Sequence, residues 1–373
     1  MSFWLEYGSR EARPLVAFAD ELAATPAGRP GICFGPLNAP LTSLEPLYRQ
    51  ARVNGEAIVD PHGYLLDRTP HTQRARDHFP WLAQTPRPTT QPEWEQWMQR
   101  GVDHQLSTRL CGDAGPPSFV ITPSPMMDAA APDDLNMVLD AAIAVRSRVS
   151  GLDCWLGVTV DRTYLREQTH LTRLLNAVIQ TGADGVVFRA PHSWMAPVDD
   201  RFYLSGLREV IETCAANGIR IFLPSSGWLG WLAMGWGAWG FSGGMAGGSW
   251  LDRIPGPITR PDEPPLPYFE PQLLRAVPWR SHQQLMSEAT YEPCGCTECV
   301  QMGNSHDLTL AKRHQIRHAS EETAALTAVP AGDRRQLVAD RLDAAIGFRD
   351  SLSRMTTTRI PTTIHLDRWR ALL

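Results

Sequence analysis

The chain is poor in lysine and in charge of either sign. Among its 35 basic residues only Lys312 is a lysine, and the rest are arginines. Charged residues make up 20% of the 373 residues, and the formal net charge is −5. This mild acidity excludes a histone-like protein or a basic tail that binds nucleic acid through bulk charge, but it leaves a local basic groove open. With 43% hydrophobic residues, the chain is expected to bury a sizeable core as one large or two ordinary domains.

Long hydrophobic runs are also missing. The most apolar stretch, residues 218–248, is broken by Pro224 and ten glycines, so it does not predict a membrane helix of about 20 residues. The first ten residues carry Glu6 and Arg10 and lack a signal-peptide pattern. Four of the seven cysteines are scattered through apolar segments, which is typical of reduced thiols in a cytoplasmic protein. These four are Cys33, Cys111, Cys154 and Cys214.

Short apolar segments that end in glycine, proline, serine or aspartate recur along the chain. They alternate with amphipathic helical patterns over residues 133–149, 170–180 and 204–217, the last two closing near Gly182 and Gly218. Eight strands separated by helices predict an α/β fold, a TIM-like (β/α)8 barrel of about 250 residues, with a doubly wound sheet as the alternative. The predicted strands are residues 2–7, 31–35, 57–60, 118–122, 155–160, 185–188, 219–223 and 239–242.

Two segments interrupt this alternation. Residues 67–92 are polar and proline-rich and predict a long loop. Its part rich in arginine, histidine and aromatic residues, residues 67–81, is a candidate for contacts with a nucleic-acid backbone, and a merely solvated loop is the alternative. Residues 252–271 form a second proline-rich stretch. We therefore expect a barrel domain over residues 1–280. Residues 281–373 are then a zinc-binding unit with C-terminal helices that close the barrel, including one over 333–354.

The remaining three cysteines lie within six residues. Cys294, Cys296 and Cys299 form a C-x-C-x-x-C motif in which Gly295 permits a tight bend. Three thiolates at this spacing can converge on one Zn²⁺, which needs a fourth ligand. A closed site with three cysteines and one histidine is structural, and the alternative is an unliganded or redox-active loop. The histidines that follow the motif are His306, His314 and His318.

This cysteine loop, placed after an eight-stranded βα barrel and before a histidine and a helical tail, resembles the tRNA-guanine transglycosylase superfamily. Members of that superfamily exchange guanine for a 7-deazaguanine base in a polynucleotide. The resemblance extends in order over about residues 32–348, and the cysteine loop is its specific part. It implies that His318, at the head of a helix over residues 318–329, completes the zinc site, with His314 as the alternative.

A second resemblance lies in residues 58–65, I-V-D-P-H-G-Y-L. They resemble the superfamily's strand-end motif, in which an apolar pair precedes D-S-G-G-Y/F, although Pro61 and His62 replace Ser-Gly. The resemblance implies that Asp60 is the active-site aspartate beside the exchanged base, with His62, Gly63 and Tyr64 contacting the substrate. The alternative interpretation of Asp60 is a turn or helix-cap residue.

The superfamily's nucleophile is an aspartate that ends the last barrel strand and attacks the anomeric carbon of the sugar. Residues 237–248 contain no carboxylate, so Asp252, in W-L-D-R-I-P, is the candidate. A capping or salt-bridged Asp252 is the alternative. In the implied mechanism Asp252 attacks the sugar, and Asp60 handles the proton on the departing and entering bases.

The superfamily reads guanine from the ends of its middle strands, and the residues in these places differ here. Asp161 can accept hydrogen bonds from a guanine-like edge, and Arg189 can donate to a carbonyl or clamp a phosphate. Each can equally be a surface group. The candidate base-reading residues are Thr122, Thr159, Asp161 and Arg189.

Four tryptophans between residues 227 and 239, at spacings of three, five and three, are compatible with one helix face. They can pack in the core or form a platform on which a flipped base stacks. They are Trp228, Trp231, Trp236 and Trp239.

The implied function is therefore the exchange of guanine for a 7-deazaguanine base (preQ0-like) in a nucleic acid. Because the base-reading residues depart from the tRNA-type pattern, DNA is slightly favoured over tRNA. The expected partners are the nucleic acid and a free base, with no membrane, and a homodimer is one option for the oligomeric state. The alternatives are a tRNA-specific enzyme, a zinc-stabilised barrel that binds nucleic acid without catalysis, and a metal-dependent hydrolase, which needs histidine and aspartate ligands at strand ends.

Overall fold

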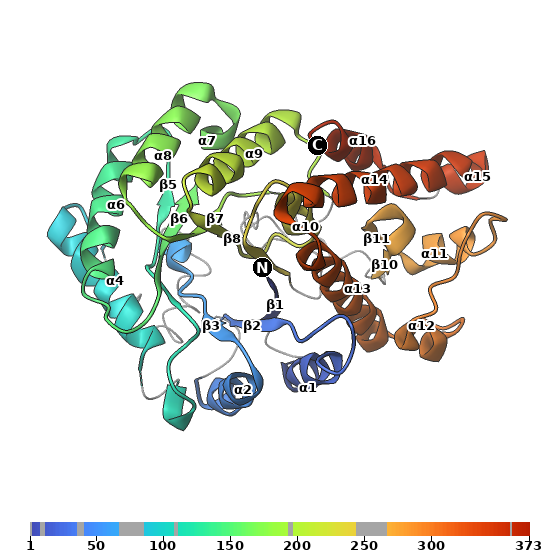
Figure 1. Cartoon of the computed structure of the whole chain (residues 1–373), viewed down its shortest axis with the longest axis horizontal. Coiled ribbons are helices and arrows are strands. Elements are labelled where there is room, and N and C mark those ends of the chain that lie inside the picture. The colour runs from blue at the N-terminus through green and yellow to red at the C-terminus, as the bar shows by residue number, and fades with distance from the viewer. Residues whose placement is uncertain are drawn as a thin grey trace.

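A nearly closed barrel of parallel strands lies at the centre of the computed structural model, with helices outside it (Figure 1). The structure describes residues 2–7, 12–35, 41–66, 86–107, 111–192, 197–243, 267–358 and 360–373. The barrel strands are β1 (Ser2–Tyr7), β2 (Gly31–Phe34), β3 (Ala57–Val59), β4 (Val120–Ile121), β5 (Met126–Met127), β6 (Cys154–Val160), β7 (Gly185–Arg189), β8 (Arg220–Leu223) and β9 (Gly240–Gly243).

The strand order is that of a closed parallel barrel rather than of a doubly wound sheet. Neighbours run β3–β2–β1–β9–β8–β7–β6–β4, every pair is parallel, and β5 pairs with β6 beyond the end of β4. The two ends of this order meet where the amide of Ser118 donates to the carbonyl of Ala57 at 2.8 Å. Each of the eight predicted strand ranges contains or overlaps an observed strand, whereas β5 lies outside them and was not predicted.

Large aromatic side chains fill the interior of the barrel. Trp4 and Trp155 are buried there among residues that include Phe119 and Phe222. Each tryptophan lies against a glycine of a neighbouring strand. A Cβ atom on Gly31 would lie 2.4 Å from the Trp4 ring. A Cβ atom on Gly185 would lie 2.3 Å from the Trp155 ring. The glycines therefore make room for indole rings at the barrel axis.

A polar layer follows this apolar layer towards the carboxyl ends of the strands. Because successive side chains of a strand point to opposite faces, inward positions recur every second residue. Trp4, Ile58 and Val187 belong to the interior apolar cluster, and Glu6, Asp60 and Arg189 stand two residues further along. Carboxyl ends of barrel strands carry the active sites of this architecture.

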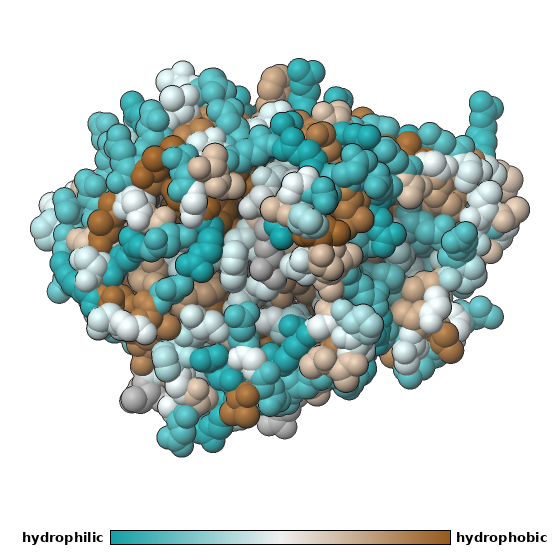
Figure 2. All heavy atoms as spheres, in the orientation of Figure 1, coloured by the Kyte–Doolittle hydropathy of each residue, from teal (hydrophilic) through white to brown (hydrophobic). Residues whose placement is uncertain are grey.

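Helices cover the outside of the barrel, and their apolar faces form the largest core with the outer faces of the strands. Hydrophilic residues predominate on the solvent side of these helices (Figure 2). Gly182 and Gly218 have φ of 58° and 73° after two of the helices, as predicted. The helices are α1 (Ala12–Leu22), α2 (Leu41–Asn54), α4 (Gln91–Gln105), α6 (Asp133–Arg146), α7 (Thr163–Arg166), α8 (Gln168–Gln180), α9 (Arg201–Ala216) and α10 (Trp228–Gly235).

The C-terminal part begins with an antiparallel hairpin and continues in helices. One of these, α13, packs against β1 and between α1 and α10, so it fills the outer ring beside the first strand (Figure 1). The division of the chain at residue 280 stays a prediction. The elements are β10 (Pro267–Glu270), β11 (Arg275–Pro278), α11 (Trp279–Leu285), α12 (Thr297–Met302), α13 (Leu308–Ala328), α14 (Arg334–Ser351), α15 (Arg354–Thr357) and α16 (Ile364–Arg370).

Two helical expectations need correction. The helix predicted to begin at residue 318 begins at Leu308, where the side chain of Asp307 accepts a hydrogen bond from the amide of Leu310. The four tryptophans do not share one helix face, because α10 ends before Trp236. Trp231 and Trp236 are buried in the core, which supports the packing interpretation. None of the helices in the described part of the chain combines the length and apolarity needed to cross a bilayer.

Candidate active site and metal centre

A buried ion pair lies at the carboxyl end of the barrel. Arg189, the last residue of β7, donates from Nη2 to Oδ2 of Asp60 at 2.5 Å, and the two side chains are only 3% and 4% exposed. The other carboxylate oxygen of Asp60 accepts from the amide of His62 at 2.9 Å. Burial alone would raise the pKa of Asp60, but the Arg189 guanidinium and His62 hold it below its usual value. Asp60 is therefore an ionised carboxylate, as a residue that contacts a cationic or N–H-rich edge requires.

The turn after Asp60 folds back over the ion pair. His62 adopts φ 46°, a left-handed conformation that is uncommon outside glycine. Its Nδ1 lies 2.8 Å from the hydroxyl oxygen of Tyr64 and 3.7 Å from Oδ2 of Asp60. The Tyr64 ring, in the 3₁₀ turn Gly63–Leu65, has the guanidinium of Arg189 5.5 Å from its centroid. The structure thus brings together four of the predicted site residues.

The other predicted base-reading residues differ in what they contact. Thr122 accepts from the amide of Gly157 at 3.0 Å and so links β4 to β6. Asp161 accepts at 2.6 Å from each of two backbone amides, those of Ala129 and Thr163. Thr159 is different, because it pairs in register with Arg189 and its buried hydroxyl has no hydrogen-bond partner among the described residues. Thr159 is therefore the best placed of the three to contact a ligand.

Gly63 packs tightly against the segment between β4 and β5. A Cβ atom at this position would lie 2.6 Å from the backbone nitrogen of Ser124. A larger residue would push the His62–Tyr64 turn away from the barrel, so the role of Gly63 that the structure shows is close packing of the turn. Its predicted contact with the substrate stays a prediction.

The predicted nucleophile lies outside the described residues. Asp252 follows the end of β9 by nine residues, and the structure describes the chain to residue 243 and again from residue 267. The arginine- and histidine-rich loop predicted over residues 67–92 falls largely in the stretch 67–85, which is likewise outside the described residues. Within β9 itself there is no carboxylate.

Sequence reasoning missed Glu6, on β1. Its Oε1 accepts from the hydroxyls of Ser225 and Ser242, each at 2.5 Å. The pKa of Glu6 is raised: burial is the largest cause and the negative charge of Asp60 adds to it, while the two hydroxyls and Arg189 act in the opposite direction. The alternation of side chains along the first strand could have indicated Glu6, because it places residue 6 on the same face as Trp4 and near the carboxyl end of that strand.

A group of four side chains that could hold a metal ion lies in the C-terminal part. The ligand atoms of Cys294, Cys296, Cys299 and His314 all lie within 4.8 Å of one another. Nδ1 of His314 lies 3.9, 3.3 and 3.2 Å from the three sulfurs in chain order. Ligand atoms around a tetrahedral zinc, with bonds of about 2.0–2.3 Å, lie about 3.5–3.8 Å apart, so these residues fit a metal ion of that kind.

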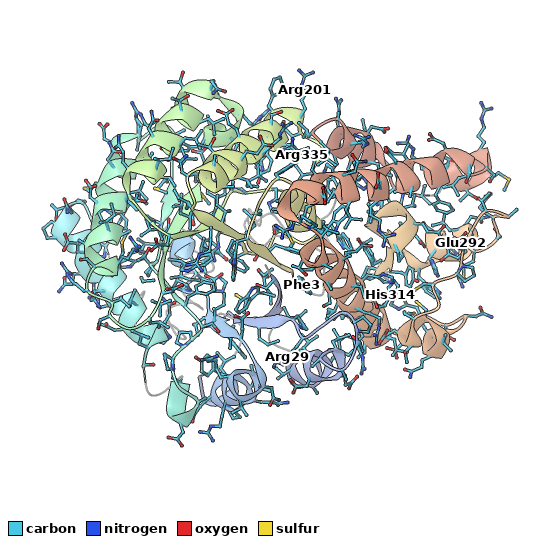
Figure 3. All side chains as sticks on the ribbon, viewed as in Figure 1. Phe3, Arg29, Arg201, Glu292, His314 and Arg335 are labelled. Atoms are coloured by element: carbon cyan, nitrogen blue, oxygen red, sulfur yellow. The ribbon has the colours of Figure 1, made fainter. Side chains whose placement is uncertain are left out.

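The fourth ligand that the structure favours is His314, the alternative in the sequence, rather than His318. His314 lies on the side of α13 that faces the hairpin (Figure 3), and its Nε2 donates to the carbonyl of Phe269 at 2.8 Å. This bond fixes Nδ1 as the atom that points at the sulfurs. His318, one turn further on and in the middle of α13, has its Nε2 3.3 Å from the sulfur of Cys294 but stands outside the group of four.

Neighbouring groups hold the thiols in place. The sulfur of Cys296 accepts from the amide of Cys299 at 3.4 Å at the start of α12. The hydroxyl of Tyr268 lies 3.1 Å from the sulfur of Cys299. Glu298, between the ligands, forms a two-pronged ion pair with Arg317 of α13 at 2.7 and 2.8 Å. These contacts tie the cysteine loop to α13 and prearrange the ligands.

The comparisons with known proteins leave the family open: no protein-family model matches the chain, and no curated protein matches it either.

Proposed function

We propose that the protein exchanges guanine for a 7-deazaguanine base in a nucleic acid, with DNA slightly favoured over tRNA. The observation that supports this best is the assembly of Asp60, Arg189, His62 and Tyr64 at the carboxyl end of a parallel barrel. A buried ionised carboxylate can accept hydrogen bonds from the N1–H and amino group of guanine, and the arginine beside it can donate to a carbonyl. The tyrosine ring adds an aromatic surface for a base.

The exchange needs a group that attacks the sugar and a group that moves a proton. Asp252 remains the proposed nucleophile, whose carboxylate forms a bond to the anomeric carbon as the base leaves. In this proposal the cysteine–histidine cluster holds Zn²⁺, which supplies a structural crosslink between the cysteine loop and α13 and takes no part in the reaction.

The test is incorporation of a labelled base. The protein is incubated with labelled guanine or 7-cyano-7-deazaguanine and with either duplex DNA or tRNA, and incorporation into DNA is expected to be the greater. Asp60→Asn is expected to lower the rate at least 100-fold. A matched control, Asp140→Asn on the exposed face of α6, is expected to leave it unchanged.

A second candidate function has one observation in its favour. Among the described residues, the last barrel strand, β9, carries no carboxylate that could attack the sugar, as expected for a barrel that binds nucleic acid without catalysis. Binding of duplex DNA or tRNA without incorporation into either would select this candidate and reject base exchange.

A further inference from the structure

Glu6 stands at the carboxyl end of the barrel, which we call the barrel mouth, beside the ion pair of Asp60 and Arg189. It is the second residue after Trp4 along β1, so it points inward one layer above the aromatic interior. The residue as a whole is partly exposed, whereas its carboxyl group is buried. Its charged neighbours among the described groups are Asp60, directly after β3, and Arg189 at the end of β7, and β2 contributes the buried thiol of Cys33.

The hydroxyls of Ser225 and Ser242 hold the carboxyl group of Glu6, and the backbone of Ser225 is strained. Ser225, just after β8, has φ 55°, a left-handed conformation that is strained for a residue other than glycine. The backbone of Ser225 is held in this conformation, because its amide donates to the hydroxyl of Ser242 at 2.8 Å. The strained serine and Ser242 both donate to Oε1 of Glu6, and among the described residues no hydrogen bond to its other oxygen is found.

The two carboxyl groups of the mouth are tuned in opposite directions. Asp60 has a full cationic partner and a lowered pKa, whereas Glu6 has only neutral hydroxyl partners and a raised pKa. When the pKa values of two neighbouring carboxyl groups are shifted in opposite directions, the group with the raised pKa can act as the acid and the other stays ionised. Proton transfer is most efficient from a group whose pKa lies near the working pH, and Asp60 is the less suited of the two.

We propose that Glu6 is the group that carries the proton between the departing and the entering base. This inference rests on the proposed base exchange. It reassigns the proton from Asp60 to Glu6 and leaves Asp60 with Arg189 to hold the base.

In the first half of the reaction, the protonated carboxyl of Glu6 gives its proton to a ring nitrogen of the departing guanine. The bond between the sugar and N9 breaks, its electron pair stays on the base, and a carboxylate of the protein bonds to the anomeric carbon. In the second half, Glu6 takes the N9 proton of the entering 7-deazaguanine. N9 then attacks the anomeric carbon and releases the carboxylate. The proton taken equals the proton given, so no co-reactant is needed.

The experiment follows release of labelled guanine from duplex DNA in the presence of 7-cyano-7-deazaguanine, across the pH range. Because Glu6 must be protonated to donate, the rate of guanine release in the wild type is expected to fall as the pH rises through the pKa of Glu6. Glu6→Gln is expected to lower kcat at least 100-fold, to change KM for the base less than about threefold and to remove this fall. The matched control is Glu56→Gln, an exposed glutamate before β3, which is expected to behave as wild type.

A second variant covers the case in which Glu6→Gln does not fold. Ser242→Ala keeps Glu6 but removes a hydroxyl that stabilises its ionised form, so the falling limb of the profile is expected to move to higher pH. An unmoved limb in Ser242→Ala, or wild-type rates in Glu6→Gln, overturns the role of Glu6 and leaves base exchange standing. A covalent adduct mapped to Glu6 by mass spectrometry likewise overturns it. A wild-type protein that exchanges no base overturns the proposed function and this role with it.

Discussion

Arg189 and Asp60 form an ion pair across the barrel rather than between adjacent strands. Arg189 ends β7 and Asp60 directly follows β3, and these two strands are not neighbours in the sheet. The two side chains nevertheless meet at 2.5 Å and are almost completely buried. This pair therefore forms only when the barrel closes, and it joins the two halves of the sheet at the end where the proposed reaction takes place.

Loss of one partner of this pair is expected to destabilise the fold. In Arg189→Leu, Asp60 is left buried without its cation, and the free energy of unfolding is expected to fall by about 3 kcal/mol or more. Urea unfolding followed by circular dichroism measures this. The double variant Arg189→Leu/Asp60→Asn leaves no buried charge and is expected to lose less than the single variant. Equal losses in the two would mean that the unpaired charge is not the cause.

The two carboxyl groups are expected to give stability opposite dependences on pH. The pKa of Asp60 is lowered on folding, so its contribution is present above the unfolded value of about 3.9 and is lost as the pH falls through the folded pKa. The pKa of Glu6 is raised, so its contribution is present below about 4.3 and is lost as the pH rises through the folded pKa. The free energy of unfolding of each variant is measured from pH 3 to 8 in steps of about one unit. Asp60→Asn is expected to lack the loss of stability at low pH, and Glu6→Gln is expected to lack the loss of stability as the pH rises.

The metal site is expected to bind one zinc ion per chain through His314. Cys296→Ser and His314→Ala are expected to lose the metal, because each removes a ligand from a four-coordinate site. His318→Ala serves as the matched control and is expected to retain it. Metal content by mass spectrometry under native conditions decides between the two histidines, and retention in His314→Ala with loss in His318→Ala would restore the sequence-based choice.

The glycines beside the interior tryptophans are expected to tolerate no side chain. In Gly31→Ala the new methyl group would lie 2.4 Å from the Trp4 ring, and the barrel must shift, at an expected cost of about 1–3 kcal/mol. Gly332→Ala has open space around the new methyl group and provides the control. Thermal unfolding compares the two, and equal melting temperatures would contradict the packing described for the barrel interior.

Much of the fold could be predicted because barrel strands carry a local signal. A run of buried residues between turn formers marks each strand, and helices with an apolar face lie between them. Helix α13 was misplaced by ten residues at its start, because its cap, Asp307, follows directly on the loop of the cysteine motif, and its buried face contains polar residues such as His314 and Ser320. Such a face gives a weak periodic pattern.

The candidate site was predictable only in part, because its contacts join distant segments. Asp60 and the turn after it lie in one short motif, whereas their partner Arg189 is 129 residues away and meets them only through closure of the barrel. Glu6 has no motif around it, and its partners are serines more than 200 residues along the chain. His314 and His318 are one helical turn apart, so only the orientation of α13 against the hairpin separates them.

The carbonyl of Phe269 that receives the hydrogen bond of His314 belongs to a residue whose ring stacks on Trp228 at 4.3 Å, with the two planes 3° apart. Trp228 opens α10, and the amide of Gly227 just before it donates to the carbonyl of Ser242, one of the two serines that hold Glu6. A short chain of contacts therefore joins the cysteine–histidine cluster to the barrel mouth. Removal of a metal ion from that cluster is expected to loosen the hold on Glu6 as well as the packing of the C-terminal helices.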